Sequence, residues 1–379
     1  MQLTNWAKQH LSGNWLNICL TLLAGLMIWQ GVIAGISWWG QAQWSVIADN
    51  FRLFAVGRYP ADQDWRLWCL LWLTMCLAGA GWGRWGRWRR DVAISVVAGF
   101  TMSAIALPVD LPSRLAILCA GGLVLAGFWG GQCLKGWRYG GIALAIAVVA
   151  HFPIAIWLIG GGWGLVPVNS NLWNGFLLTM LLAQFSIFFS FPIGAVLALG
   201  RQSDLPVINW LSRCYIEVMR GLPLVGILFM AQVLLPLFLP QGVVIERVWR
   251  AIAGFVLFTS AYVAEYLRGG LQAIPKGQVE AAQSLGLNAM QINLLIIFPQ
   301  ALRIAIPGLA GQFISLFKDT SLVAVVGMVD LMGISRSILA NPVYLGRYAE
   351  VYLFVGAVYG LISYGMAWVS YRLEQSIHA

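Results

Sequence analysis

A long stretch without charged side chains most constrains what this sequence can fold into. From Tyr139 to Gly200 there is no Asp, Glu, Lys or Arg, and further apolar runs lie on both sides. A soluble domain carries about 25% charged residues. This chain of 379 residues has 10% charged and 60% hydrophobic residues, with a mean hydropathy of +0.78. These properties indicate a protein that crosses a lipid bilayer many times.

The continuous apolar runs favour helices over the strands of a membrane barrel. Membrane strands alternate apolar and polar residues, and a helix needs about 20 apolar residues to cross a bilayer. We therefore expect an all-α polytopic membrane protein with about 10 transmembrane helices, at residues 18–38, 67–83, 92–107, 115–132, 142–159, 173–199, 215–239, 252–267, 292–312 and 351–371. The apolar piece at 322–329 is too short to cross, so we expect a partly inserted or external helix there.

Basic residues set the expected orientation. The net charge is +9, and Lys and Arg concentrate on the cytoplasmic loops of membrane proteins. With the N-terminus inside, the cytoplasmic loops carry twelve Lys and Arg residues and the outer loops seven. One inside loop alternates arginines with tryptophans: Arg84, Trp85, Arg87, Trp88, Arg89 and Arg90. Stacking on nucleic acid is one interpretation, but a membrane-surface loop is favoured. We expect both termini in the cytoplasm and no nucleic-acid partner.

The sequence lacks the residues that would let it use a nucleotide by itself. A P-loop needs a Gly-Lys-Ser/Thr sequence, and none of the four lysines follows a glycine. The six cysteines form no CxxC pair, and the three histidines are widely separated. We therefore expect no disulfide framework, no metal site and no cofactor in this chain.

A polar interruption at residues 269–299 separates two expected spans, and the orientation places it in the cytoplasm. Pro275 suits the start of a helix, where its missing N–H costs little. Val279, Ala282 and Leu285 are three residues apart and share one helical face. Gly286 can adopt the left-handed conformation that ends a helix. The segment predicts a short helix at about 275–287 with a small-residue face that suits close docking.

The same segment has a specific spacing: Glu280-Ala281-Ala282, Gly286, Ile296, Phe298 and Pro299. This spacing resembles the EAA motif of ABC importer permeases, with Phe298 where Leu is common. Further stretches resemble the polar amino acid (histidine/glutamine-type) permeases: SFPIGAVLALGRQS (190–203), YIEVMRGLPLVGILF (215–229), AYVAEYLRGGLQAIPKGQVEAA (261–282) and FKDTSLVAVVG (317–327). With its additional N-terminal spans, the chain resembles the longer membrane component of bacterial general or acidic/neutral L-amino acid importers.

The resemblance implies a type I ABC importer permease core at residues 166–379, preceded by about five extra helices at residues 1–165. The EAA helix of such a permease sits in a groove of an ATPase subunit. The matching positions imply ATPase-coupling roles for Gly277, Glu280, Ala281, Ala282 and Gly286.

The resemblance also implies partners and a location. The chain would be the permease subunit of an ATP-driven importer for polar, acidic or neutral L-amino acids, not itself an enzyme. It would form half of the pathway, with a second permease, a different chain, as its neighbour. An ABC ATPase dimer would bind ATP and Mg, and a periplasmic amino acid-binding protein would deliver the substrate. The expected location is the bacterial inner membrane, surrounded by lipid.

Charged groups within the spans suggest where substrate passes, because charge inside a bilayer is costly and usually functional. These groups are Glu217, Arg220, Glu265, Arg268, Arg303, Lys318 and Asp319. An amino acid zwitterion needs an acceptor for its ammonium group and donors for its carboxylate. Lys318, Asp319, Thr320 and Ser321 provide both kinds of group in one turn. We place this turn on the substrate pathway, together with Arg220 and Glu265.

A structural interpretation of these charges is at least as strong. Glu265 and Arg268 are three residues apart, as are Glu217 and Arg220, so each couple could pair on one helix. For the whole chain, two other functions stay open. One is a stand-alone secondary transporter or channel, which is disfavoured because no internal repeat is evident. The other is a membrane scaffold or receptor, especially for the N-terminal spans.

Overall fold

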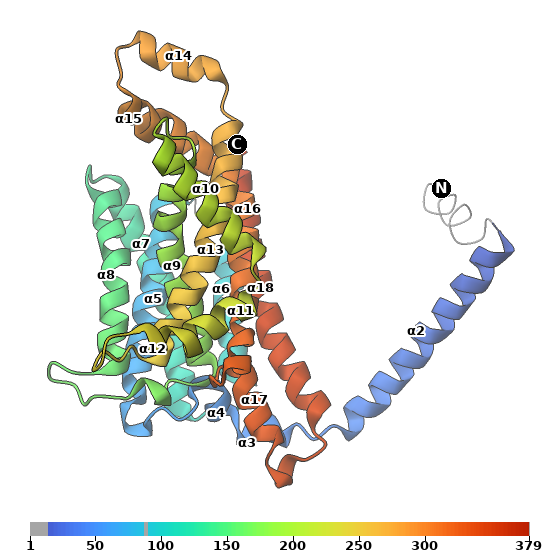
Figure 1. The fold of residues 1–379 in the computed structure, drawn as a ribbon. Coiled ribbons are helices and arrows are strands. Elements are labelled where there is room, and N and C mark those ends of the chain that lie inside the picture. Colours follow the sequence, from blue (N-terminus) through green and yellow to red (C-terminus); the bar gives the residue numbers. More distant parts are fainter. Residues whose placement is uncertain (1–13, 87–89, 379) are drawn as a thin grey trace.

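The computed structural model describes residues 14–86 and 90–378, and every named element in these ranges is a helix. Arg87, Trp88 and Arg89 of the expected arginine–tryptophan loop lie outside the described residues, as does Lys8. The long helices form an upright bundle with α14 at one end and α17 at the other (Figure 1). They are α5 (Asp64–Trp85), α6 (Arg90–Ala106), α7 (Leu111–Lys135), α8 (Gly140–Gly160), α9 (Gly175–Arg201), α10 (Pro206–Gly221), α13 (Arg247–Gln272), α16 (Phe298–Asp319) and α18 (Tyr348–His378), and one further long helix, α2 (Trp15–Gln41), stands apart from them.

Shorter helices connect and cover these. They are α3 (Ser45–Asp49), α4 (Phe51–Val56), η1 (Ala61–Gln63), η2 (Ser170–Leu172), α11 (Leu224–Phe229), η3 (Met230–Leu234), α12 (Leu235–Phe238), α14 (Lys276–Ser284), α15 (Ala289–Gln291), η4 (Ile292–Ile297), η5 (Thr320–Val326), α17 (Leu331–Leu339) and η6 (Pro342–Tyr344). Of these, η3 and η4 are π-helical turns. The expected non-spanning piece at 322–329 corresponds to η5, whereas α17 was not anticipated.

Seven helices of the described ranges are long and apolar enough to cross a membrane, and a bent pair brings the number to eight. The all-helical membrane fold is therefore confirmed, and the count of ten is not. The helices α5 and α6 cover two expected spans but are not among the seven. The first contains five tryptophans, which are less hydrophobic than aliphatic residues, and the second is only 17 residues long.

The expected span at 215–239 is wrong as a single helix. Its first part belongs to α10, which ends at Gly221, and the chain then bends by 102° into the arm formed by α11, η3 and α12. The bend lies at the sequence Gly221-Leu222-Pro223. Proline cannot continue an incoming helix, and it disfavours helical geometry in the residue before it. In Figure 1 the arm lies across the bundle instead of along it.

One hydrophobic core joins the two expected parts of the chain. Leu182 and Phe185 of α9 pack with Phe255 of α13, and all three are buried. The same cluster contains Tyr59, which precedes η1, and Phe152 of α8. The Tyr59 hydroxyl donates to the carbonyl of Ile159 at 2.9 Å. The N-terminal helices therefore pack directly on the C-terminal ones.

Two glycine pairs bring α5 and α7 into backbone contact. A Cβ at Gly79 would overlap the carbonyl oxygen of Val124, and one at Gly83 would overlap that of Phe128. Reciprocally, Gly127 and Gly131 of α7 lie against carbonyl oxygens of α5. Small residues four apart permit such close approach between membrane helices. The sequence signal for this pairing is the four-residue spacing of glycines in both helices.

At the α17 end, the segment that links α2 and α5 is buried against the core. Two of its side chains, those of Val46 and Phe54, are each only 1% exposed. They pack with Leu331 and Ile334 of α17 and Val351 of α18. By contrast, α2 has no buried residue and projects away from the bundle (Figure 1).

Candidate functional site

The expected coupling helix is present as α14, which lies at one end of the bundle between α13 and α15 (Figure 1). Pro275 occupies the N-cap position, directly before Lys276. The helix ends at Ser284, and Gly286 follows with a φ of +76°. The amides of Gly286 and Leu287 donate to the carbonyls of Gln283 and Ala282, at 2.9 and 3.3 Å. This pair of bonds is a Schellman motif, in which glycine takes the left-handed position without strain.

The buried face of α14 differs from the expected docking face. Ala282 is only 2% exposed and packs into a cluster that includes Ile292 and Ile297 of η4. Val279 packs beside it, whereas Leu285 is 79% exposed. The three residues therefore do not form one docking surface. In this chain Ala282 anchors α14 to its own core, because its small side chain lets the helix lie close to η4.

The opposite face of α14 is open. Gly277, Glu280 and Ala281 are exposed, as is Gly286 in the turn that follows. A Cβ at Gly277 would meet nothing within 4 Å. Glycine inside a helix costs roughly 0.5–1 kcal/mol relative to alanine, and no packing within this chain requires it. A smooth surface without side chains at Gly277 suits the close approach of a second molecule.

The chain returns from α14 into the bundle through a capped and irregular turn. Asn288 and Gln291 form a reciprocal capping box, with bonds of 2.9 and 3.0 Å between side chain and backbone. The π-helical turn η4 follows and contains Ile296. Pro299 then lies in the first turn of α16, where its lack of an N–H removes a regular helical hydrogen bond. The motif's Ile296 and Pro299 thus define the joint between α14 and α16.

A cluster of charged side chains lies on α13, near the end of that helix that leads into α14. Glu265 forms an ion pair with Arg201 of α9 at 3.0 Å and another with Arg220 of α10 at 3.2 Å. Arg268 of α13 also donates to Glu265, through Nε at 3.0 Å. The Glu265 side chain is 21% exposed. One carboxylate therefore joins three helices at this end of the bundle.

The two expected pairs had different outcomes. The Glu265–Arg268 pair is present. The expected Glu217–Arg220 pair is wrong, because Arg220 turns to Glu265 and Glu217 lies 3.7 Å from Arg201. The guanidinium of Arg220 also lies over the Tyr262 ring, 5.6 Å from its centroid. Charges in neighbouring helices, which sequence spacing does not reveal, decided the pairing.

The turn from Lys318 to Ser321 spans the end of α16 and the start of η5. Lys318 is exposed and Asp319 is half-buried. Thr320 is fully buried, and its hydroxyl donates to the carbonyl of Phe317 at 2.7 Å. The Ser321 hydroxyl donates to the carbonyl of Lys318 at 2.9 Å. Both hydroxyl protons are therefore used within the turn, which leaves the two charged groups as its candidates for binding a solute.

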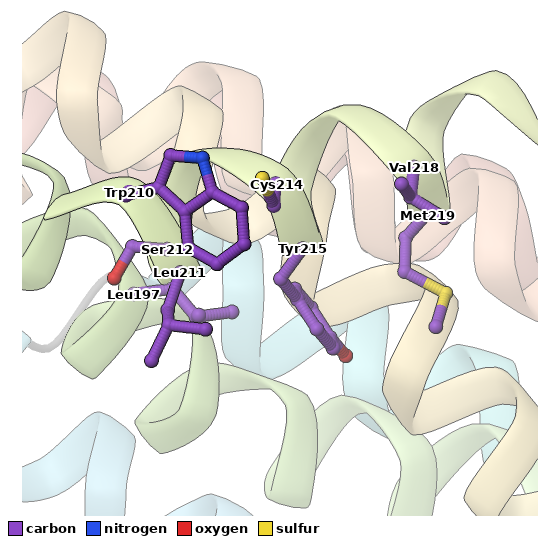
Figure 2. A pocket seen from close by; sticks show the side chains of 8 residues that line it. All are labelled: Leu197, Trp210, Leu211, Ser212, Cys214, Tyr215, Val218 and Met219. Carbon is purple, nitrogen blue, oxygen red and sulfur yellow. The ribbon is translucent and has the colours of Figure 1, made fainter. Parts of the chain in front are cut away.

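A surface groove of about 490 Å³ lies along α10 and α9 (Figure 2). Its lining is mostly apolar and consists of Leu197, Trp210, Leu211, Ser212, Cys214, Tyr215, Val218 and Met219. The Tyr215 hydroxyl donates to the carbonyl of Leu257 at 2.9 Å and lies 3.0 Å from the Ser260 hydroxyl. No charged group lines the groove, so it does not suit a zwitterion.

The sequence interpretation missed a polar position in the bent arm. Gln232 lies within η3 and is 7% exposed. Its side-chain amide donates to the carbonyl of Arg247 at 2.7 Å. The available signal was a single glutamine within the apolar run MAQVLL, followed by arginines at 247 and 250. Over the described residues, no group of three or more His, Cys, Asp or Glu side chains is placed to hold a metal.

The candidate spans, the broken span and the short projecting helix α14 define a multi-pass membrane protein. Residues 190–379 match the family described as binding-protein-dependent transport system inner membrane component. The chain is similar to the inner membrane amino-acid ABC transporter permease protein YhdY of Escherichia coli, with 33% identity over 98% of this chain and 92% of the relative. The chain belongs to the family of binding-protein-dependent transport system inner membrane components.

Two further similarities were found. The glutamate/glutamine/aspartate/asparagine transport system permease protein BztC of Rhodobacter capsulatus is 37% identical over 89% of this chain and 79% of its own length. A crystal structure of an amino acid ABC transporter with histidines has a chain that is 31% identical and covers 53% of this one. That match spans 91% of the solved chain, with a TM-score of 0.48.

The family confirms several expectations. The chain is an ABC importer permease of the amino-acid type and not a catalyst, because ATP hydrolysis in this family belongs to a separate subunit. Membership implies an ATPase partner and a partner permease. The chain is a multi-pass protein of the inner membrane.

Proposed function

We propose that this chain forms one half of the translocation pathway of an ATP-driven importer for polar, acidic or neutral L-amino acids. The names of the relatives from Escherichia coli and Rhodobacter capsulatus support this substrate class. The observation that carries the proposal is α14, which joins two candidate spans and presents an open face at the end of the bundle. A helix with this placement can transmit movement of a partner to both neighbouring spans.

The exposed face of α14 is our proposed contact with the ATPase. Gly277 and Ala281 permit close approach, Glu280 offers a charge, and Gly286 sets the turn that orients the helix. Ala282 takes part indirectly, by holding α14 against η4. ATP and Mg are bound by the partner ATPase, and this chain contributes no cofactor site.

The α14 end faces the cytoplasm in this proposal, with both termini on that side. Support comes from basic residues at this end, such as Lys135 at the end of α7, Arg201 at the end of α9 and Lys276 at the start of α14. Helices α5 and α6 then count as spans, although they are less apolar, because α7 packs against both. This gives about ten spans, of which five precede the core.

The division into N-terminal helices (1–165) and a permease core (166–379) is supported by the family match at 190–379, with the coupling helix at about 275–287. In this proposal the second permease is a different chain. A periplasmic amino acid-binding protein docks at the α17 end. Lipid surrounds the apolar outer face, and nucleic acid is not a partner.

The proposed pathway includes Arg220 and Glu265 near the α14 end and Lys318 and Asp319 near the α17 end. The side chain of Arg220 is 40% exposed, so it can meet a passing solute while it pairs with Glu265. The two residues after Asp319 stabilise the backbone of this turn. The hydroxyls of Thr320 and Ser321 each donate a hydrogen bond to a backbone carbonyl.

Reconstitution in liposomes tests this function against the stand-alone alternative. Vesicles that contain this chain, its partner permease and the ATPase should accumulate radiolabelled L-glutamine or L-glutamate only with ATP inside and binding protein outside. Uptake by the lone chain, driven by an ion gradient, would show a secondary transporter and overturn the proposal. Assembly without uptake of any amino acid would favour a scaffold.

A further inference from the structure

The bent arm holds a buried acceptor that no described residue of the chain satisfies. Gln232 lies in the π-helical turn η3, and its Nε2 donates to the carbonyl of Arg247 at 2.7 Å. This bond leaves Oε1 as the free end of the amide, and Oε1 is buried without a hydrogen-bond partner among the described residues. An unsatisfied buried acceptor is costly, and π-helical turns are frequent at functional sites. Gln232 is therefore suited to accept a hydrogen bond from a ligand.

Two arginines at the start of α13 lie directly beside Gln232. Arg250 donates through Nη1 to the backbone carbonyl of Gln232 at 2.5 Å, and its buried Nε has no hydrogen-bond partner in residues 14–86 and 90–378. Arg247 donates through Nη2 to the carbonyls of Val326 and Gly327, each at 3.0 Å. These bonds hold both guanidinium groups in place but neutralise neither charge.

The arginine pair lacks a counter-ion within the part of the chain that the structure describes. Among the described residues, no carboxylate lies within ion-pair distance of Arg247 or Arg250, and the ion pairs of Glu265 are with Arg201, Arg220 and Arg268. The two arginines are three residues apart on one helix, where like charges repel. They also lie in the first turn of a helix, whose N-terminus favours negative charge. This place can be stabilised by a bound anion.

We propose that Gln232, Arg247 and Arg250 form a binding site for the main-chain groups of an amino acid. The guanidinium groups bind its carboxylate, and Oε1 of Gln232 accepts a hydrogen bond from its ammonium group. The inference rests on the proposed function and adds a specific site to it. The arginines around Glu265 are less suited to bind a substrate carboxylate, because the Glu265 carboxylate already pairs with all three of them.

A carboxylate could reach this place from two sources: a free amino acid or an acidic side chain of the binding protein. The three residues differ in access, since Arg247 is exposed, Arg250 is half-buried and Gln232 is buried. A side chain on a docked protein would engage the exposed Arg247 and would be insensitive to Gln232. A free zwitterion requires both the inner acceptor and the arginines.

The test is equilibrium binding of radiolabelled L-glutamine to the complex of both permeases and the ATPase in nanodiscs, without binding protein. Gln232→Leu and Arg250→Gln should each weaken binding roughly ten- to hundredfold, as for loss of a hydrogen bond to a charged group. Arg250→Lys keeps the charge and should lose less. Arg336→Gln, an exposed arginine of α17 at the same end of the bundle, should change affinity by no more than about twofold. L-Glutamine amide, which lacks the carboxylate, should bind weakly and equally to wild type and Arg250→Gln.

Several outcomes overturn the site. Unchanged glutamine affinity in both Gln232→Leu and Arg250→Gln does so, as does absence of measurable binding to the wild-type complex. A loss confined to the affinity of labelled binding protein for the complex assigns the arginines to protein docking instead. Basal ATP hydrolysis and size-exclusion profiles show whether each variant assembles. If Arg250→Gln does not assemble, glutamine affinity is measured in the conservative variant Arg250→Lys. Failure of the proposed function is separate, because it would show as no amino acid uptake by the wild-type system.

Discussion

Arg201 at the end of α9 and Glu265 on α13 lie 3.0 Å apart, between Nη1 and Oε2, although 64 positions separate them in the chain. Glu265 also pairs with Arg220 and Arg268, so its carboxylate holds three guanidinium groups together. Without this carboxylate, repulsion between the three positively charged guanidinium groups would be the dominant interaction among them. The carboxylate is thus the link between α9, α10 and α13 near α14.

Glu265→Gln should destabilise the chain by about 1–3 kcal/mol, because three partly buried cations lose their shared acceptor. Glu217→Gln is the matched control. Its side chain is 69% exposed and 3.7 Å from Arg201, so its loss should cost less than about 1 kcal/mol. Thermal unfolding of the purified proteins measures both. Equal effects would contradict the central role of Glu265.

Glu280→Arg should uncouple ATP hydrolysis from uptake, because it reverses a charge on the exposed face of α14. Gly286→Asp should act in the same direction by disturbing the turn at φ +76°. The ratio of amino acid imported to ATP hydrolysed, in proteoliposomes, should fall at least roughly tenfold, as for loss of a charged contact. Asp62→Arg changes an exposed carboxylate of η1, outside both α14 and the proposed amino acid site, and serves as control. Normal coupling in both α14 variants would argue against docking there.

Gly83→Leu should separate α5 from α7, because even a Cβ at this position overlaps the carbonyl oxygen of Phe128. We expect a loss of folded protein equivalent to more than about 2 kcal/mol, as in overpacked cores. Gly130→Leu, on α7, meets nothing within 4 Å of its Cβ and should be tolerated. The yield of monodisperse protein and its Tm distinguish the two. Similar behaviour of both variants would refute the close helix contact.

The pH dependence of stability at the α17 end should follow Asp330, which precedes α17. Burial raises the pKa of its carboxyl group to about 6, against hydrogen bonds from the amides of Gly333 and Met332 and from the Tyr359 hydroxyl, which lower it. Because this folded-state pKa exceeds the unfolded value, protonation favours the folded state. The stabilisation that Asp330 gives the folded state is complete below about pH 4 and is lost as the pH rises through about 6.

Wild-type protein should therefore lose about 1 kcal/mol of stability from this group between pH 5 and pH 7. Asp330→Asn is neutral at both pH values and should lack this part of the dependence. Hydrogen exchange of the α17 amides, measured at the two pH values, localises the effect. An identical pH dependence in wild type and variant would exclude Asp330 as its source.

The sequence by itself determined the membrane class and the position of the short helix α14. Continuous apolar runs can bury their backbone only as helices in lipid, so they indicated an all-helical membrane protein, but they did not reveal the bend after Gly221 or the helix α17. The helix at 276–284 followed from local signals, since Pro275 and Gly286 set its ends through backbone chemistry alone. The spacing from Glu280 to Pro299 was enough to indicate the family.

Only the tertiary structure decided which groups meet. Ala282 faces inward because η4 folds back against α14. Helical periodicity alone cannot show which face of this short helix packs against the rest of the protein. Arg220 pairs with Glu265, and the arginines of α13 meet Gln232, because a 102° bend brings distant segments together. Such contacts depend on how helices cross, and crossing is set by close packing over the whole bundle, not by any one stretch of chain.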